Sequence, residues 1–282
     1  MKLPDYSVLM SVYKNEKAEY LRTAMNSMWN QTVVTNDFVL ICDGPLTDDL
    51  DEVIKDMQLR HPKELHVIRL KQNRGLGRAL RAGVLECKNE LIARMDSDDI
   101  SRPNRCEREL EVFAADPDIS IVSTVLEEFF EIEEGETVPK AVTAVRVVPE
   151  THEEIYDFAK KRTPFNHPSV MYKKSAVIDS GSYQEFYYLE DYLLWVKILQ
   201  KGYKGYNLQE PLLWMRAGAD MYKRRAGLKY AKSQQKLFKY MKKTGFISTG
   251  QYIKSVTIRT CSSLAPNGIR ERMFKSMLRK KG

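Results

Sequence analysis

The stretch ELIARMDSDDISRP, residues 90–103, places Asp96, Asp98 and Asp99 directly after an apolar run. Neighbouring carboxylates repel one another, so this cluster costs free energy unless a cation or solvent relieves it. Because Asp and Ser readily form turns, an acidic turn at the end of a strand is the simpler interpretation. A binding site for a divalent metal ion is the more specific interpretation. The rest of the chain decides between them.

Three more apolar runs precede this one. They are YSVLMSVY (6–13), DFVLICDG (37–44) and ELHVIRL (64–70), each rich in Val, Ile and Leu. Nearly continuous apolar character is typical of strands that are covered on both faces. Residues 21–29 and 74–87 have helical patterns that fall between the strands. Strands that alternate with helices predict right-handed βαβ units, and therefore an α/β fold with a mainly parallel central sheet.

The second half of the chain mixes both kinds of element. Its patterns predict helices over residues 103–115, 151–162, 190–202 and 222–243. They predict strands over residues 119–130, 141–148 and 167–172. Thr151 and Glu154 have the spacing of a capping box at a helix start. Gly202 is placed to end the helix that begins at Glu190.

Length and composition indicate a soluble globular protein. The 282 residues suffice for one large α/β domain or two smaller ones, and 43% are hydrophobic and 29% charged. The scattered cysteines favour reduced thiols in the cytoplasm over a zinc site or disulfides; they are Cys42, Cys87, Cys106 and Cys261. We expect no signal peptide, because a proline and charges interrupt the N-terminal run. We also expect no membrane-spanning helix, because no 18-residue window is apolar throughout.

The charge is divided unevenly along the chain. Residues 216–282 hold 18 Lys and Arg against two acids, and residues 1–215 hold 27 basic and 36 acidic groups. We therefore predict an α/β domain over residues 1–215 and a basic, helical, amphipathic region over residues 216–282. Such a basic region indicates an anionic partner, which could be nucleic acid, a phospholipid surface or a phosphorylated acceptor. A merely solvated basic face is the alternative.

Polar side chains follow three of the four predicted strands. They occur in the segments 13–16, 43–44 and 96–98. In an open parallel sheet, ligands bind beyond the carboxyl ends of the strands. Asp96 and Asp98 would point to the same side of an extended segment, with Cα atoms about 6–7 Å apart. Oxygen donors without His or Cys select Mg²⁺ or Mn²⁺, which commonly take phosphate oxygens as further ligands. A nucleotide diphosphate is therefore the expected companion.

Several separated motifs now point to one family. DSDD is followed by P-x-R, then by NHPSVMYKKSA, then by LEDYLLWVKILQKG. With these motifs the chain resembles the bacterial family 2 glycosyltransferases of the GT-A fold, above all those that build O-antigen or capsular polysaccharide. SVLMSVYKNE, CDGP and QNRGLGRALRAG match that family's spacing as well. The resemblance covers about residues 6–216. It implies a Rossmann-like sandwich and a catalytic domain over residues 1–215.

The resemblance implies roles for the residues of the donor site. Asp98 would coordinate the metal ion, and Asp96 would hold the donor ribose or a metal-bound water. Asp43 would read the base by accepting a hydrogen bond from a uracil N–H. The remaining donor-site residues would be Tyr13, Glu16 and Arg74, each of which is otherwise an ordinary turn or surface residue.

The resemblance also implies the catalytic base. The family pattern places it at Asp191, where a carboxylate accepts the proton of the acceptor hydroxyl, which typically accelerates a reaction about 10²–10⁴-fold. A single base opposite the leaving diphosphate implies inversion at the anomeric carbon. Acids are also favoured at helix N-termini by the dipole alone. Glu190 would orient loops or the acceptor.

Three further residues are candidates for acceptor or phosphate contacts. His167 is expected to pack or form hydrogen bonds near the acceptor. Arg216 and Arg225 would reach phosphates from a closing loop, because guanidinium matches phosphate geometry.

The expected function is inverting, metal-dependent transfer of a hexose, with Mn²⁺ or Mg²⁺ as cofactor. The expected donor is UDP-glucose, UDP-galactose or an N-acetyl analogue, and the acceptor a saccharide on a lipid diphosphate. The basic region would lie on the anionic inner face of the cell membrane, where each Lys or Arg contributes about 1 kcal/mol. Nucleic acid is not expected, since no binding motif is recognisable.

Two alternatives stay open. Nucleotidyl transfer uses a similar sheet and acidic metal ligands, but usually needs a glycine-rich basic loop after the first strand, and KNEKAEY supplies none. The other alternative is a non-catalytic membrane- or nucleic-acid-binding protein with a transferase-like body.

Overall fold

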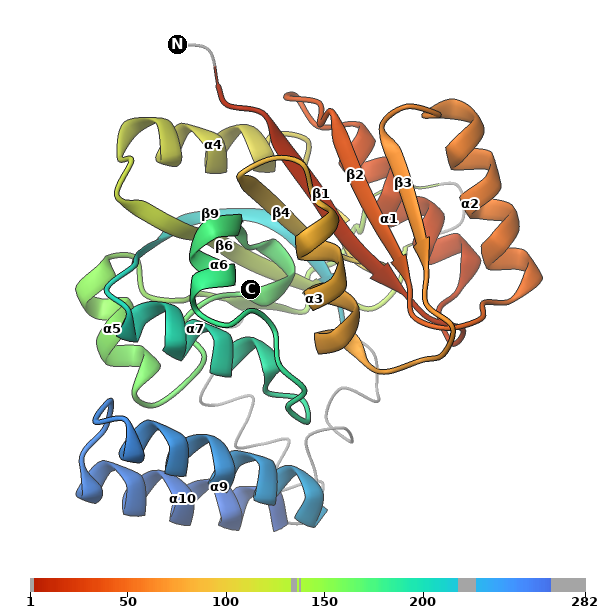
Figure 1. Cartoon of the computed structure of the whole chain (residues 1–282). Helices are drawn as coiled ribbons and strands as arrows, with labels where there is room; N and C mark the ends of the chain where they lie inside the picture. Colours follow the sequence, from red (N-terminus) through yellow and green to blue (C-terminus); the bar gives the residue numbers. More distant parts are fainter. Residues whose placement is uncertain (1–2, 133–135, 137, 218–226, 265–282) are drawn as a thin grey trace.

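The computed structural model of this chain describes residues 3–132, 136, 138–217 and 227–264. Four parallel strands form one half of its central sheet (Figure 1). They are β1 (Tyr6–Val12), β2 (Asp37–Cys42), β3 (Leu65–Arg69) and β4 (Leu91–Asp96). β1 lies between β2 and β4, and β3 pairs with the outer side of β2. These strands match the four predicted apolar runs to within two residues at each end.

Helices cover both faces of this half of the sheet. The helices are α1 (Ala18–Trp29), α2 (Asp48–Arg60), α3 (Leu76–Glu86) and α4 (Arg105–Ala115). Alternate residues of each strand face opposite sides, so Val8 and Met10 pack with the apolar sides of α1, α2 and α4, whereas Leu9 packs with α3. The predicted continuous apolar runs are therefore explained by two hydrophobic cores, one on each face.

The approach of α3 to the sheet depends on Gly83. A Cβ atom on Gly83 would lie 2.3 Å from Cδ1 of Leu9 and 3.0 Å from Cγ1 of Ile41. Leu9 and Ile41 are both fully buried. The backbone of α3 therefore lies directly on the side chains of β1 and β2.

The other half of the sheet is mixed. Its strands are β5 (Ile100–Ser101), β6 (Ile119–Phe129), β7 (Ala144–Arg146), β8 (Met171–Lys173) and β9 (Lys204–Arg216). The order across the sheet is β3-β2-β1-β4-β8-β6-β9-β5, with β7 paired to β6. β8 is antiparallel to β4 and β6, and β9 runs parallel to β6. The predicted α/β sandwich with a mainly parallel sheet is confirmed.

Two predicted strands are shorter in the structure. Residues 141–148 contribute only the three residues of β7, and residues 167–172 divide into a 3-10 helix (His167–Ser169) and the start of β8. Pro168 has no N–H to donate to a strand partner, and Ser169 N–H bonds instead to the carbonyl of Asn166, which closes a turn.

The helices predicted over residues 151–162 and 190–202 are present as α5 (His152–Ala159) and α7 (Glu190–Gln200). Of the helix predicted over residues 222–243, residues 227–243 are helical, and residues 222–226 lie outside the described residues. One further helix, α6 (Lys174–Asp179), was not predicted. The capping box of Thr151 and Glu154 is formed, with reciprocal bonds between their side chains and backbone N–H groups. Gly202 has a φ of +84°, as expected of a residue that ends a helix.

A helical hairpin follows the sheet. α9 (Gly227–Lys243) and α10 (Thr249–Leu264) lie side by side, next to α5 and α7 in Figure 1. The rings of Phe238 on α9 and Tyr192 on α7 meet edge to face, with centroids 6.3 Å apart. In the part of the chain that the structure describes, no helix is both long and apolar enough to cross a membrane. The division at residue 215 falls at the end of β9 and stays a prediction.

The cysteines are free thiols. Cys42, Cys87 and Cys106 are buried, and Cys261 on α10 is exposed. Burial is the main cause that raises the pKa of Cys42 to about 11 and those of Cys87 and Cys106 to about 12. Since reactivity requires the thiolate, the three buried thiols are packing residues.

Candidate active site

The first of the three clustered acids is held by a buried arginine. Asp96 is the last residue of β4, and the guanidinium of Arg94 from the same strand donates to both of its carboxylate oxygens. Arg94 is 1% exposed. Arg105 supports it from α4 by donating to the carbonyl of Arg94 at 2.7 Å. Asp96 is therefore already neutralised and positioned by the protein.

The other two acids lack such compensation. Burial, followed by the carboxylates of Asp96 and Glu16, raises the pKa of Asp98 to about 7. Burial and the neighbouring Asp98 raise the pKa of Asp99 well above its usual range. Asp99 accepts a hydrogen bond from the backbone N–H of Arg216 at 2.8 Å, while its other oxygen, also buried, has no partner among the described residues. The acidic turn is short of positive charge.

A divalent cation fits this turn only with help from a ligand. Among residues 3–132, 136, 138–217 and 227–264, no three His, Cys, Asp or Glu side chains converge to hold an ion by themselves. Asp98 is the carboxylate best placed to bind one, because Asp96 is bound to Arg94. Mg²⁺ and Mn²⁺ usually take one or two carboxylates and fill their other positions with phosphate oxygens and water. The residues therefore fit an ion that binds together with a diphosphate.

Glu16 joins the turn after β1 to the acidic turn. Its carboxylate accepts a hydrogen bond from the Ser97 hydroxyl at 2.6 Å, and its backbone N–H donates to the carbonyl of Tyr13. Tyr13 is 41% exposed beside it. The structure thus brings two predicted donor-site residues to the edge of the sheet where Asp96 and Asp98 lie.

Asp43 has a structural task that the sequence did not reveal. One of its carboxylate oxygens accepts the backbone N–H of Arg74 at 2.8 Å, and the other accepts that of Gly75 at 2.9 Å. Gly44 follows with a φ of +92°, and a Cβ atom there would lie 2.6 Å from the backbone nitrogen of Asn73. Asp43 and Gly44 therefore fix the loop before α3. A contact of Asp43 or Arg74 with a base stays a prediction.

Glu190 and Asp191 form the first turn of α7, as predicted. Burial, followed by the charge of Asp191, raises the pKa of Glu190 to about 7, and Asp96 contributes in the same direction. A Cβ atom on Gly77 would lie 3.3 Å from that of Glu190, so the first turns of α3 and α7 touch. The acids of α7 and the acidic turn after β4 are therefore near one another at one edge of the sheet.

His167 is a packing and hydrogen-bonding residue. Its Nε2 atom lies 3.0 Å from the Tyr183 hydroxyl, and its ring meets that of Trp195 edge to face. Burial, followed by the charge of Arg94, lowers its pKa well below the usual range, so the ring is neutral. Its contact with the acceptor stays a prediction.

Arg216 lies against the acidic turn rather than on a distant loop. Its Nε donates to the carbonyl of Asp98 at 3.0 Å, and its guanidinium lies 3.7 Å from the ring centre of Tyr20. β5 pairs with β9, which brings the end of β9 to this place. Arg225 lies outside the described residues.

The sequence matches a known family model. Residues 7–186 match the model described as Glycosyl transferase family 2. The chain belongs to this family.

Three relatives are similar over nearly their whole lengths. An uncharacterized glycosyltransferase of Haemophilus influenzae is 36% identical, with 98% of this chain and 99% of the relative covered. The amylovoran biosynthesis glycosyltransferase AmsE of Erwinia amylovora is 34% identical, with 96% and 98% covered. A UDP-Gal:alpha-D-GlcNAc-diphosphoundecaprenol beta-1,3-galactosyltransferase of Escherichia coli is 35% identical, with 98% of each chain covered.

Solved structures show the same fold. Residues 1–349 of S. aureus TarS in complex with UDP-GlcNAc superpose with a TM-score of 0.66 at 17% identity, over 97% of this chain and 76% of that chain. The mannosyltransferase PcManGT of Pyrobaculum calidifontis, in complex with GDP-Man and Mn²⁺, gives a TM-score of 0.63 at 14% identity, over 98% and 76%. The predicted GT-A fold is thereby confirmed. This protein is a glycosyltransferase. Nucleotidyl transfer and a non-catalytic role are therefore excluded as its main function.

Two arginines of this glycosyltransferase were missed as site residues. Arg94 stands inside the apolar run LIARMD, and a charged residue in a strand buried on both faces is the signal that could have found it. Arg105 is the arginine of the P-x-R motif, is fully buried and pairs with Glu109 on the next turn of α4. Both arginines position Asp96.

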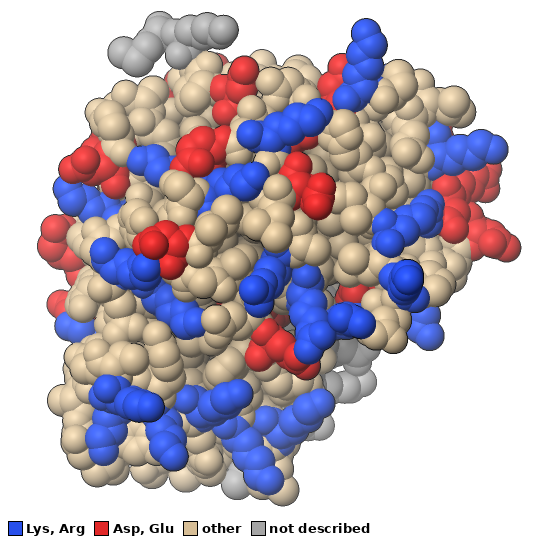
Figure 2. Space-filling view, in the orientation of Figure 1, with Lys and Arg blue, Asp and Glu red and all other residues tan. Residues whose placement is uncertain are grey.

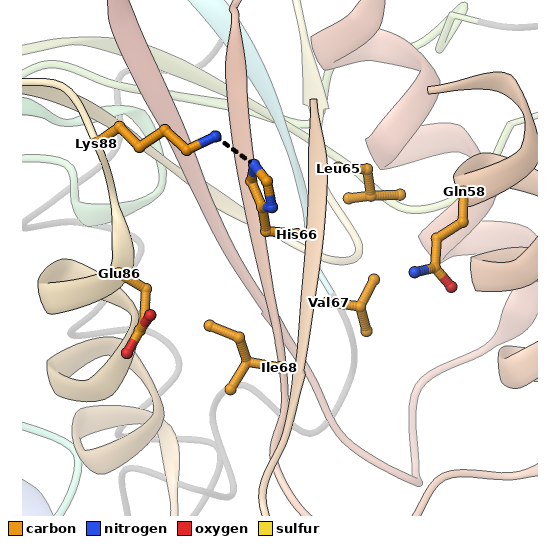
Figure 3. A pocket seen from close by; sticks show the side chains of 7 residues that line it. All are labelled: Gln58, Leu65, His66, Val67, Ile68, Glu86 and Lys88. Atoms are coloured by element: carbon orange, nitrogen blue, oxygen red, sulfur yellow. Dashed lines mark hydrogen bonds between the residues drawn. The ribbon is translucent and has the colours of Figure 1, made fainter. Parts of the chain in front are cut away.

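A pocket of this glycosyltransferase lies away from these acids. It follows the outer side of β3, and Figure 3 shows its lining residues, which are Gln58, Leu65, His66, Val67, Ile68, Glu86 and Lys88. Lys88 Nζ lies 2.7 Å from His66 Nε2, and both lie within 4 Å of the buried carboxylate of Asp37. Asp37 begins β2, so this pocket is at the amino ends of the parallel strands, opposite the candidate active site.

Proposed function

We propose that this glycosyltransferase moves a hexose from a UDP-sugar to a sugar on a lipid diphosphate, with inversion at the anomeric carbon, in the synthesis of a surface polysaccharide. The observation that carries the proposal is the meeting of the acidic turn after β4 with the acidic first turn of α7. The Escherichia coli relative, whose name gives UDP-Gal as donor and alpha-D-GlcNAc-diphosphoundecaprenol as acceptor, supports this choice of donor and acceptor.

The donor binds at the acidic turn. Asp98 would hold Mn²⁺ or Mg²⁺ together with the diphosphate, and the ion would supply Lewis-acid stabilisation of the leaving diphosphate. Asp96, oriented by Arg94, would hold the ribose or a water of the ion. Tyr13 and Glu16 line the base and ribose pocket. The donor pocket is completed by the loop that Asp43 fixes, including Arg74.

Asp191 is the base. Its carboxylate accepts the proton of the acceptor hydroxyl as the hydroxyl oxygen attacks the anomeric carbon from the side opposite the diphosphate. A single in-line displacement inverts the configuration. Glu190 is partly buried beside it, and its raised pKa leaves it partly protonated near neutral pH. In its protonated form Glu190 can donate a hydrogen bond that orients the acceptor.

We further propose that the helical hairpin binds the inner face of the cell membrane. Residues 227–264 contain eight Lys and Arg and no acid. Five lysines recur every three or four residues and form one stripe along α9: Lys229, Lys232, Lys236, Lys239 and Lys243. Figure 2 shows the blue side chains gathered over the hairpin. Flotation with vesicles tests this: we expect binding to phosphatidylglycerol vesicles that salt weakens, and equal behaviour with neutral vesicles would contradict it.

UDP release tests the chemistry. We expect UDP release from one of several UDP-sugars in the presence of Mn²⁺, and its loss with EDTA. Asp191→Asn is expected to lower kcat about 10²–10⁴-fold, because the base is removed. Asp98→Asn should weaken donor binding, and Asp157→Asn on the exposed face of α5 serves as the control. Release that is indifferent to EDTA, or full activity of Asp191→Asn, would refute the mechanism.

A further inference from the structure

Two exposed tyrosines precede the acids of α7 and have no part in the mechanism above. Tyr187 is 37% and Tyr188 43% exposed, and their ring centroids are 4.4 Å apart. Aromatic rings that lie together on a surface present a large apolar area with polar hydroxyl edges. Exposed aromatic pairs of this kind are typical of binding surfaces.

The backbone at Tyr188 is strained. Its φ is +55°, and within the described part of the chain only one other non-glycine residue, Ser182, has a positive φ. A side chain with a Cβ atom rarely adopts this conformation, because it costs free energy. Such strain persists only where the surroundings enforce it, and it is concentrated at functional sites.

The surroundings of this loop do enforce it. On one side, Gln184 and Glu185 lie against the start of α3, where Arg78 Nε donates to the Glu185 carboxylate at 3.0 Å. On the other side, the Ser233 hydroxyl of α9 donates to the carbonyl of Tyr187 at 2.8 Å. The two tyrosines are thus presented by a loop clamped between α3 and the hairpin, so a ligand need not order them.

A cation stands beside the tyrosines. Lys229 Nζ lies 4.1 Å from the ring centre of Tyr187, and Lys236 Nζ lies 5.0 Å from that of Phe186. Lys229 thereby covers one face of Tyr187, while Tyr188 is the more exposed of the two rings and the one closer to Asp191 along the chain. Tyr188 precedes Asp191 by three residues, a span of at most about 11 Å along the chain. The acceptor hydroxyl has to reach Asp191, so the sugar that carries it must lie near this loop.

We propose that Tyr188 and Lys229 form the acceptor subsite for a sugar diphosphate. The pyranose ring packs its C–H groups on the ring of Tyr188, and Lys229 contacts the diphosphate oxygens as a compact point charge. The inference rests on the proposed function, because it assumes that Asp191 is the base. The donor sugar could also pack on the ring of Tyr188. We assign the acceptor sugar to this ring because the donor diphosphate is assigned to the acidic turn.

The first test is a substitution that removes the aromatic ring of Tyr188 without adding backbone strain. Tyr188→Asn keeps a residue that tolerates positive φ, and Tyr188→Phe keeps the ring. The probe is N-acetylglucosamine α-linked to a diphosphate with a short alkyl chain. We expect Tyr188→Asn to raise the KM for this probe about 3–10-fold, the range for one aromatic contact, and Tyr188→Phe to stay within about twofold. Lys229→Gln should raise the same KM, and Lys55→Gln on the exposed face of α2 is the matched control.

Two further measurements separate this inference from the proposed function. Hydrolysis of the UDP-sugar without acceptor reports the donor site, and saturation-transfer NMR of the probe reports binding without catalysis. We expect hydrolysis and Tm to be unchanged in Tyr188→Asn, while the NMR signal of the pyranose protons falls. If the wild type neither hydrolyses any UDP-sugar nor transfers sugar from one to the probe, but still binds the probe through Tyr188, the binding site for a sugar diphosphate stands and the proposed function fails.

The opposite pattern overturns the subsite alone. It is overturned if the wild type transfers sugar while Tyr188→Asn leaves the probe's KM and NMR signal unchanged. It is also overturned if the wild type does not bind the probe, or if Tyr188→Asn raises the KM for the UDP-sugar instead, which would place the donor on this ring. An unchanged KM in Lys229→Gln would remove the diphosphate contact.

Discussion

Asp43→Asn tests whether the carboxylate of Asp43 holds the loop before α3. Both oxygens of Asp43 accept backbone N–H groups, from Arg74 at 2.8 Å and from Gly75 at 2.9 Å, and the residue is 5% exposed. Asn has the same shape but only one oxygen. Its NH₂ group therefore faces one of the two N–H donors, which is left without a partner.

The expected loss follows from these two bonds. A hydrogen bond to a charged group contributes about 1.5–3 kcal/mol, and a buried donor left unpaired costs about 1–3 kcal/mol. One bond is lost and the other becomes a weaker, neutral one. We expect Asp43→Asn to lower the free energy of unfolding by about 2–3 kcal/mol, equivalent to a fall in Tm of roughly 4–10 °C for a domain of this size.

Urea unfolding of wild type and variant measures this loss. Asp56→Asn is the matched control, because Asp56 accepts hydrogen bonds from Arg22 and Arg60 on the surface, where solvent screens the charges. The m-value should be unchanged, since the same surface is exposed on unfolding. A loss in Asp43→Asn no larger than that in Asp56→Asn would refute the loop-holding role. It would leave the predicted base contact as the reason for an acid at this position.

Two further predictions concern the packing of the core. Gly83→Ala should lower the free energy of unfolding by about 1–3 kcal/mol through overpacking against Leu9, although Ala favours a helix. Gly250→Ala in α10 is the control and should cause no such loss, because the nearest atom is 3.9 Å from the new Cβ. Equal urea midpoints of the two variants would contradict this prediction. Burial raises the pKa of Glu109 from about 4.5 to about 7, so its protonated form contributes stability that is present below pH 4.5 and lost as the pH rises through 7. The unfolding free energy of the wild type should therefore fall relative to Glu109→Gln between pH 5 and pH 8 in urea titrations, and a difference independent of pH would contradict this.

The parallel half of the fold is readable from the sequence. The runs that become β1 to β4 are apolar on both faces because helices cover both, and this pattern is local. The capping box at Thr151 and the stop at Gly202 are also local, because each involves residues within a few positions. The acidic turn and the family motifs also led to the roles predicted for Asp96, Asp98 and Asp191, and these roles stay predictions.

The missing parts depend on contacts between distant segments. β9 was not predicted, since its pairing with β6 joins residues far apart in the chain and its sequence, KGYNLQEPLLWMR, lacks a clear alternation. The role of Asp43 depends on backbone N–H groups 31 and 32 residues later, which no side-chain pattern reveals. The burial of Arg105, which donates to the carbonyl of Arg94 eleven residues earlier, likewise depends on how α4 packs on the sheet.

The four thiols differ in exposure, so one of them can be labelled selectively for spectroscopy. Three are enclosed in the core and protonated at ordinary pH, whereas Cys261 is exposed on α10. A maleimide dye should therefore attach at one site of the unaltered protein. A polarity-sensitive fluorophore there would report the arrival of the hairpin at a lipid bilayer in real time, without a single engineered substitution.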